Sequence, residues 1–178
     1  SLAEVSGASG WETLSALAPI GKRAVPARSP SKTTNRMLSR LSESDFALLE
    51  SHLVSVDLPL RKQIEMSRRP IGHVYFPDSG IISVVANGDH ERGIEVGLIG
   101  REGMTGLAVV MGTDRSPHQT FVQSTGRAQK IRSDDLRAAI RQSTTLHQRF
   151  LLYAHAFLMQ TGYTAMATGR SKIEDRLA

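Results

Sequence analysis

The stretch from Ile94 to Leu107, which reads IEVGLIGREGMTGL, decides the fold. Its first six residues, up to Ile99, alternate in the way that is typical of a β-strand. From Gly97 onward it is the densest cluster of glycines in the chain. Glycine permits the tight turns that join short strands. The stretch therefore predicts a β domain whose strands are connected by glycine-dependent turns.

Short strands are predicted on both sides of this stretch. Apolar residues alternate with a period of two in several segments, namely Val54–Leu58, Ile64–Met66, Val74–Phe76 and Ile82–Val84, and further strands are predicted at Thr120–Ser124 and Arg127–Ile131. The strongest hairpin signal between them is Asn87-Gly88-Asp89. Strands at this spacing without intervening helices predict an antiparallel sandwich or barrel.

Helical patterns flank the strands. Ser42 precedes an apolar period and is predicted to be the N-cap of a short amphipathic helix. Ser133, followed by two aspartates, is predicted to cap a second helix. A third and longer helix is expected to begin near Ser143 or Thr144.

The long helix carries two adjacent apolar stripes, one of Leu146, Phe150, Tyr153 and Phe157 and one of Leu151, Ala154, Leu158, Thr161 and Ala165. If one stripe packs on the sheet and the other meets a second copy, the protein is a homodimer. The predicted interface comprises Phe150, Leu151, Ala154, Phe157, Leu158, Thr161 and Ala165. The alternative is one broad core face on a monomer. Gly162 costs about 1 kcal/mol relative to alanine unless a close backbone approach uses it, which favours the dimer.

The two ends of the chain have a different character. Residues 1–34 contain proline, serine and clustered basic residues, so we expect a flexible basic tail, with nucleic-acid contact as the alternative. Gly169 is predicted to end the long helix, and Ser171-Lys172-Ile173-Glu174 reads as a capping box. We expect a helical dimerisation segment at 133–170, and at 171–178 the start of a DNA-binding domain that is missing from this chain.

Composition excludes several classes of protein. The 178 residues include no cysteine, which excludes disulfides, iron–sulfur clusters and thiol nucleophiles. No apolar run approaches the roughly 18 to 20 residues of a membrane span, and the N-terminus lacks the apolar stretch of a secretory signal, so a cytoplasmic protein is expected. The net charge of +5 favours a polyanionic partner.

Several motifs resemble the cyclic-nucleotide-binding-like domain of Crp/Fnr transcription regulators, namely His73–Pro77, Gly80–Val85, Glu95–Met104 and Val122-Gln123. The resemblance covers about Asn35 to Ala178. It implies that residues 35–132 form an antiparallel, eight-stranded β-roll, a double-stranded β-helix or jelly roll, in a chain that is mainly β with α. It also implies a short N-terminal helix, a long C-terminal dimerisation helix and a helix-turn-helix domain beyond this chain.

The resemblance places a phosphate-binding cassette in the glycine-rich region, with candidate ligand-binding residues Gly103, Gly106, Leu107, Arg115, Ser116 and His118. In the family's cyclic-nucleotide binders, a Gly-Glu pair takes the ribose hydroxyl and an Arg-Ser pair holds the cyclic phosphate. Leu107 stands in place of that glutamate, and a buried hydroxyl without a partner costs about 1 to 3 kcal/mol. Arg115-Ser116 lies about one residue out of register. These departures argue against cyclic AMP in the usual mode.

Other ligands and other functions stay open. Arg101, His118 and Gln119 could serve another anionic or polar ligand, or they are ordinary surface residues near a turn. The expected function is an effector-sensing and dimerisation domain of a bacterial DNA-binding transcription regulator, with an unidentified small-molecule effector and no assigned cofactor. The first alternative is a ligand-free dimerisation scaffold of such a regulator.

The rival from another class is a cupin-like metalloenzyme. Its metal site needs two closely spaced histidines, and no His-x-His pair occurs around His90, Glu91 and Glu95. His147 and His155 on the long helix lack the spacing of metal ligands, and no Ser-His-Asp or paired-carboxylate constellation is evident. We therefore expect no metal site and no catalytic residues, and the protein is not expected to be an enzyme.

Overall fold

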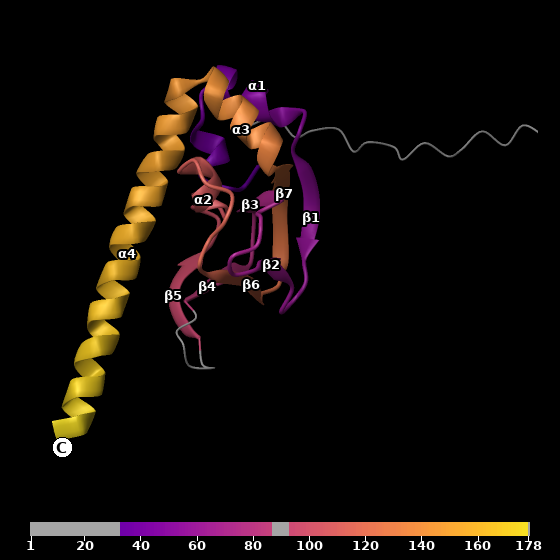
Figure 1. Ribbon diagram of the computed structural model, residues 1–178. Coiled ribbons are helices and arrows are strands. Elements are labelled where there is room, and N and C mark those ends of the chain that lie inside the picture. Colours follow the sequence, from indigo (N-terminus) through magenta and orange to yellow (C-terminus); the bar gives the residue numbers. More distant parts are fainter. Residues whose placement is uncertain (1–32, 87–92, 178) are drawn as a thin grey trace, which may run out of the picture.

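The computed structural model describes residues 33–86 and 93–177, and from Ala165 onward it describes only the backbone, apart from Met166. Within these ranges seven strands form two antiparallel sheets (Figure 1). In one sheet the order is β1 (Val54–Leu58), β7 (Gly126–Arg132) and β3 (His73–Pro77). In the other it is β2 (Gln63–Glu65), β6 (Gln119–Ser124), β4 (Ile81–Ala86) and β5 (Ile94–Ile99).

The two sheets enclose one of the two hydrophobic cores. Leu58, Tyr75 and Ala128 of the first sheet meet Ile82 and Val122 of the second in a single buried cluster. The predicted antiparallel roll is therefore confirmed. The resemblance implied eight strands, whereas the described residues form seven. The predicted turn at 87–89 lies outside the described residues, and β4 and β5 on either side of it pair antiparallel.

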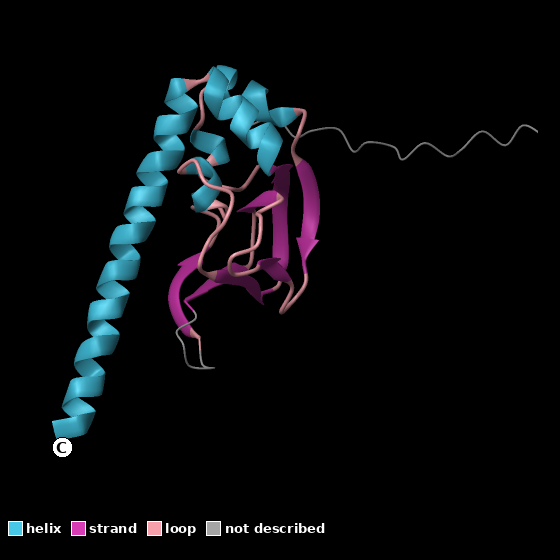
Figure 2. Cartoon of the chain, in the orientation of Figure 1, coloured by secondary structure: helices cyan, strands magenta, loops and turns pink. Residues whose placement is uncertain are grey.

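Helices gather at one end of the roll (Figure 2). These are a 3-10 turn at Leu38–Arg40, α1 (Glu43–Glu50), α2 (Leu107–Val110) and α3 (Ser133–Gln142). The last helix, α4 (Thr144–Leu177), runs from this end along the side of the roll and past β5 (Figure 1). The order of elements thus brings α4 back against the glycine-rich stretch that follows β5.

Two predicted helix starts have different outcomes. Ser42 is the N-cap of α1, and its hydroxyl accepts a hydrogen bond from the Asp45 N–H at 3.1 Å, as the sequence predicted. The predicted cap at Ser133 is wrong, because Arg132 occupies the N-cap of α3 without a side-chain bond. The Ser133 hydroxyl donates instead to the carbonyl of Ile71, which ties α3 to the segment before β3.

Two predicted boundaries also differ from the structure. Gly169 does not end the long helix, since α4 continues to Leu177 through the proposed capping box. Thr33 and Thr34 belong to the folded domain rather than to the tail, because Asp78 accepts hydrogen bonds from the Thr33 hydroxyl and the Thr34 N–H, both at 3.0 Å. The rest of the predicted tail lies outside the described residues.

The second core joins α4 to the helical end of the roll. Phe150 is fully buried, and its ring centroid lies 5.9 Å from that of Phe76. Further along α4, Ala154 is 2% exposed, and Phe157, 6% exposed, packs into the first core, between the sheets. These three members of the predicted dimer interface therefore belong to the domain's own core, which leaves Leu151, Leu158 and Thr161 on the described surface and Ala165 without a described side chain.

A buried carboxylate fixes the junction between α3 and α4. Asp45 of α1 accepts hydrogen bonds from the hydroxyls of Ser143 and Thr145, the latter at 2.9 Å. The bond from Ser143 is the main cause that lowers the pKa of Asp45, against the opposing effect of burial. The angle at which α4 leaves α3 is thus held by an ionised group.

Replacing Asp45 by asparagine should destabilise the fold by about 1 to 3 kcal/mol at neutral pH, because Ser143 and Thr145 would then donate to a neutral amide oxygen instead of a charged carboxylate. A lowered pKa in the folded state contributes stability above the unfolded pKa of 3.8, and this contribution disappears as the pH falls through the folded value. Urea unfolding of both proteins should therefore show a difference at pH 7 that shrinks below about pH 4. An undiminished difference in acid would contradict this role.

Candidate functional site

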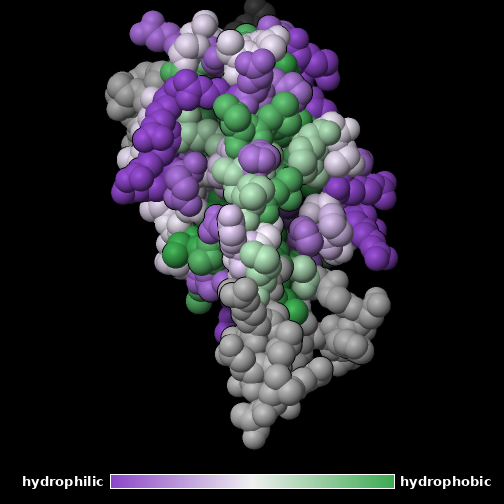
Figure 3. All heavy atoms as spheres, turned by 90° about the vertical axis from the view of Figure 1, so that its left-hand side faces the viewer, coloured by the Kyte–Doolittle hydropathy of each residue, from purple (hydrophilic) through white to green (hydrophobic). Residues whose placement is uncertain are grey.

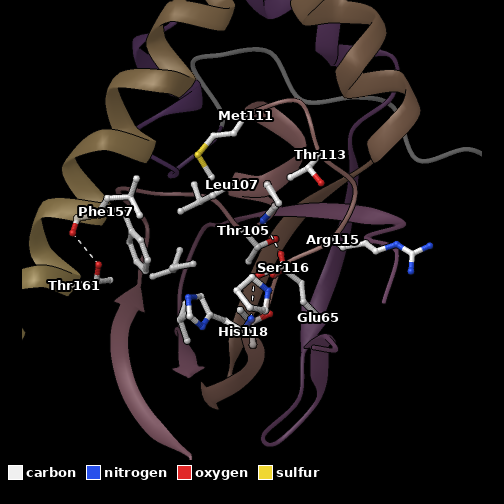
Figure 4. A pocket seen from close by; sticks show the side chains of 17 residues that line it. Glu65, Thr105, Leu107, Met111, Thr113, Arg115, Ser116, His118, Phe157 and Thr161 are labelled. Atoms are coloured by element: carbon white, nitrogen blue, oxygen red, sulfur yellow. Dashed lines mark hydrogen bonds between the residues drawn. The ribbon is translucent and has the colours of Figure 1, made fainter. Parts of the chain in front are cut away.

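A cavity of about 300 Å³ lies between the roll and α4 (Figure 4). The roll contributes Glu65 of β2, Val84 of β4, Ile99 of β5 and Thr120 of β6. The segment 105–118, which includes α2, forms a second side, and the third side consists of Phe157, Leu158 and Thr161 of α4. A molecule bound here would touch both the sheet and the long helix.

Most of the cavity wall is apolar. Val84 and Ile99 are buried on the sheet side, Leu107 and Met111 lie at the helical end, and Phe157 closes the wall from α4 (Figure 4). Leu107 packs against both hydrophobic cores. The predicted ligand residue Leu107 is therefore part of the cavity, as an apolar surface.

Gly106 forms the turn into α2 and hydrogen-bonds to the buried side chain of Glu65. Its φ of +72° is one that side chains rarely adopt, and a Cβ there would lie 2.4 Å from Val74 Cγ2. Its N–H donates to Glu65 Oε1 at 2.6 Å. Burial raises the pKa of Glu65, and the bonds from Gly106 and the Thr105 side chain partly oppose that shift. The Gly106 N–H of the predicted phosphate cassette therefore already donates to the side chain of Glu65.

Two buried side-chain atoms in the cavity wall have no hydrogen-bond partner, and among the described residues they are the only buried side-chain nitrogen or oxygen atoms without one. They are His118 Nδ1 and Thr120 Oγ1. Thr120 is 2% exposed, so its hydroxyl is shielded from bulk water. Leaving a buried polar group unpaired costs about 1 to 3 kcal/mol. Both residues line the cavity, so the two unpaired groups belong to its wall, although each of the two atoms has almost no accessible surface of its own.

Arg115 and Ser116 do not form a phosphate clamp in this structure. The Arg115 side chain is 59% exposed and points away from the cavity centre (Figure 4). Its Nε atom lies 3.5 Å from Asp114 Oδ1. The Ser116 hydroxyl accepts from the His118 N–H at 3.1 Å. Both residues lie at the cavity, but the Arg115 guanidinium faces Asp114, the Ser116 hydroxyl bonds to His118, and the Ser116 carbonyl accepts from the Arg68 N–H at 2.7 Å.

Gly103 is the remaining predicted ligand residue. It is not among the residues that line this cavity. A Cβ at Gly103 would lie 2.0 Å from the Tyr153 hydroxyl oxygen. Burial raises the pKa of that phenol, which hydrogen-bonds to the backbone of Met104. Gly103 therefore makes room for an aromatic ring of α4.

Glu65 is the site residue that the sequence reasoning missed. The period-two pattern favoured Ile64 and Met66 as the apolar face of β2, yet Met66 is 59% exposed and Glu65 is 7% exposed. β2 is only three residues long, and its register with β6 shifts between Gln63 and Glu65. At this irregularity Ile64 stays partly buried against the core while the next residue, Glu65, is buried as well, which strict alternation does not predict.

The described residues contain no group of three or more His, Cys, Asp or Glu side chains placed to hold a metal, and His90 and Glu91 lie outside them. No helix in the described part of the chain has both the length and the apolar character needed to cross a bilayer.

Solved structures with the same architecture are numerous, although neither a protein-family model nor a curated protein sequence matches the chain. The c-di-GMP-responsive global regulator CLP of Xanthomonas campestris matches with a TM-score of 0.56 at 19% identity over 70% of this chain and 63% of the regulator. The N-terminal domain of a transcriptional regulator from Streptomyces coelicolor matches with a TM-score of 0.54 at 13% identity, over 72% and 93%.

A third similar structure is a regulatory subunit of a cAMP-independent protein kinase A from Trypanosoma brucei, with a TM-score of 0.57, 14% identity and coverage of 68% and 46%. The chain therefore has the fold of the cyclic nucleotide-binding domains found in Crp/Fnr regulators. It spans less than two thirds of the length of the Xanthomonas regulator. One of these proteins is described as c-di-GMP-responsive and another as cAMP-independent.

Gly103→Ala should destabilise the domain by about 1 to 3 kcal/mol, because the added methyl group collides with a ring that its hydrogen bond holds in place. Gly72→Ala is the matched control, since a Cβ there has nothing within 4 Å. Its effect should stay within about 0.5 kcal/mol. Urea unfolding of the two variants measures the difference, and equal stabilities would refute the close packing of Tyr153 on Gly103.

Proposed function

We propose that the chain is the effector-sensing and dimerising domain of a Crp/Fnr-type transcription regulator. DNA would be bound by a further domain outside this chain, and the protein would act in the cytoplasm without catalysing a reaction. The fold, and the transcriptional regulators among the similar structures, support the regulatory class.

The observation that carries the sensing role is the position of the cavity. Its walls belong to two parts of the domain, the roll and α4, and Phe157 contributes both to the cavity wall and to the core between the sheets. A ligand that binds one placement of α4 better than another shifts the population toward that placement. Leu158 and Thr161 of α4 line the cavity, so a ligand there would contact the helix as well as the roll.

The outward face of α4 supports the dimer. Its exposed apolar side chains are Leu151, Leu152, Leu158, Met159, Tyr163 and Met166. In Figure 3, which views this side, hydrophobic residues gather along the helix. A Cβ added at Gly162 would have nothing of its own chain within 4 Å, so the backbone is accessible there. Apolar residues concentrated on one helix face are typical of a helix-pairing interface.

A cyclic nucleotide in the family's usual mode fits this cavity poorly. Leu107 offers no acceptor to a ribose hydroxyl, and the Arg115 guanidinium points away from the cavity centre (Figure 4). The Gly106 N–H is bonded to Glu65. We infer that the effector belongs to another class of molecule.

Light scattering tests the dimer. The wild-type chain should have about twice its monomer mass of 19.4 kDa, and Leu158→Glu should yield monomers, because an unpaired charge buried in an apolar interface is strongly unfavourable. Met159→Glu should do the same without altering the cavity, which Met159 does not line. Gln160→Glu, an equally charged change beside them, should leave the mass unchanged. Dimers in both Glu variants at positions 158 and 159 would exclude this interface.

A further inference from the structure

The polar groups of the cavity divide into those that are satisfied and those that are not. The Thr105 hydroxyl accepts from the Tyr75 N–H at 3.0 Å, and the Thr161 hydroxyl donates to the Leu158 carbonyl at 2.8 Å. Glu65 is bonded to Gly106. His118 Nδ1 and Thr120 Oγ1 have no partner. Among the buried side-chain atoms of the cavity lining, unmet hydrogen-bonding capacity is therefore confined to His118, just before β6, and Thr120 within it.

The charge around the cavity does not suit an anion. Arg115 is the only lysine or arginine among the described residues that line it, and its guanidinium is exposed and faces Asp114. The one acidic residue in the lining, Glu65, is 7% exposed. An anion entering the cavity would lose its hydration without gaining a cation, and it would approach the Glu65 carboxyl group.

The remaining surface is apolar, and the volume of about 300 Å³ suits a small organic molecule. We propose that the cavity binds an uncharged, mainly apolar small molecule whose single polar group hydrogen-bonds with Thr120 and His118. This inference rests on the proposed sensing function and names the chemical class of its effector. The apolar body of such a molecule would lie between Leu107, Met111 and Phe157.

Two fluorescent dyes test the chemical class directly. N-phenyl-1-naphthylamine is uncharged and carries one N–H, and 8-anilinonaphthalene-1-sulfonate has the same rings with an added anionic group. Titration of the whole chain with each dye should give at least a tenfold lower Kd for the uncharged dye, because the sulfonate loses its hydration in the cavity.

Variants locate the bound dye. Met111→Trp should fill the cavity and lower the affinity for the uncharged dye at least tenfold, whereas Met66→Trp, at an exposed position outside the lining, should not. Thr120→Val keeps the shape and removes the unpaired hydroxyl, so it should weaken binding about threefold to tenfold without lowering the midpoint of urea unfolding. That midpoint separates lost binding from lost folding.

Each other outcome has a definite meaning. Equal or tighter binding of the sulfonate, still blocked by Met111→Trp, would overturn the uncharged class while leaving the sensing function intact. Unchanged affinity in Thr120→Val would overturn the hydrogen bond. Absence of binding by both dyes, or binding that Met111→Trp does not affect, would overturn the proposal together with the sensing role and leave a ligand-free dimerisation scaffold.

Discussion

The long helix α4 approaches the roll closely at two positions, and each approach requires a glycine. The ring of Phe157 would lie 2.6 Å from a Cβ at Gly97, and the hydroxyl of Tyr153 would lie 2.0 Å from one at Gly103. These contacts set the distance between helix and sheet. They place Phe150 in the helical core and Phe157 over the sheet core, and they leave the cavity between α4 and β6. The glycines within β5 and just after it therefore serve helix packing as much as turn formation.

The same region has a polar arrangement that differs from a phosphate cradle. Gly106 turns the chain with a positive φ, but its amide is bonded to Glu65, and the only arginine of the lining points away. What remains for a ligand is an apolar wall with two unpaired polar atoms on and beside β6. The domain keeps the roll and the long helix of its fold, whereas a few side chains decide the chemistry of the cavity. The fold therefore does not determine which class of ligand the cavity suits.

Sequence patterns predicted those features that local chemistry determines. The Ser42 cap, the strand Ile94–Ile99 and the start of the long helix were all evident, because capping and alternation act over a few residues. The sequence did not show which residues of the two apolar stripes of α4 are buried in the domain's own core. Phe150 and Leu151 are neighbours, and only the placement of the sheet decides which of them is buried. The burial of Glu65 was missed because a register shift in β2 interrupts the alternation, so that Ile64 and Glu65 are both at least partly buried. The capping signals after Gly169 do not end the helix, because α4 continues through them to Leu177.

In the proposed sensor, a ligand in the cavity acts on α4. Hydrogen–deuterium exchange of the whole chain, with and without saturating N-phenyl-1-naphthylamine, measures this directly, because amides of a segment that is stabilised by binding exchange more slowly. Binding should slow exchange both in residues 105–120 and in the part of α4 around Phe157 and Thr161, which line the same cavity. Slower exchange in the roll with unchanged exchange in α4 would contradict it.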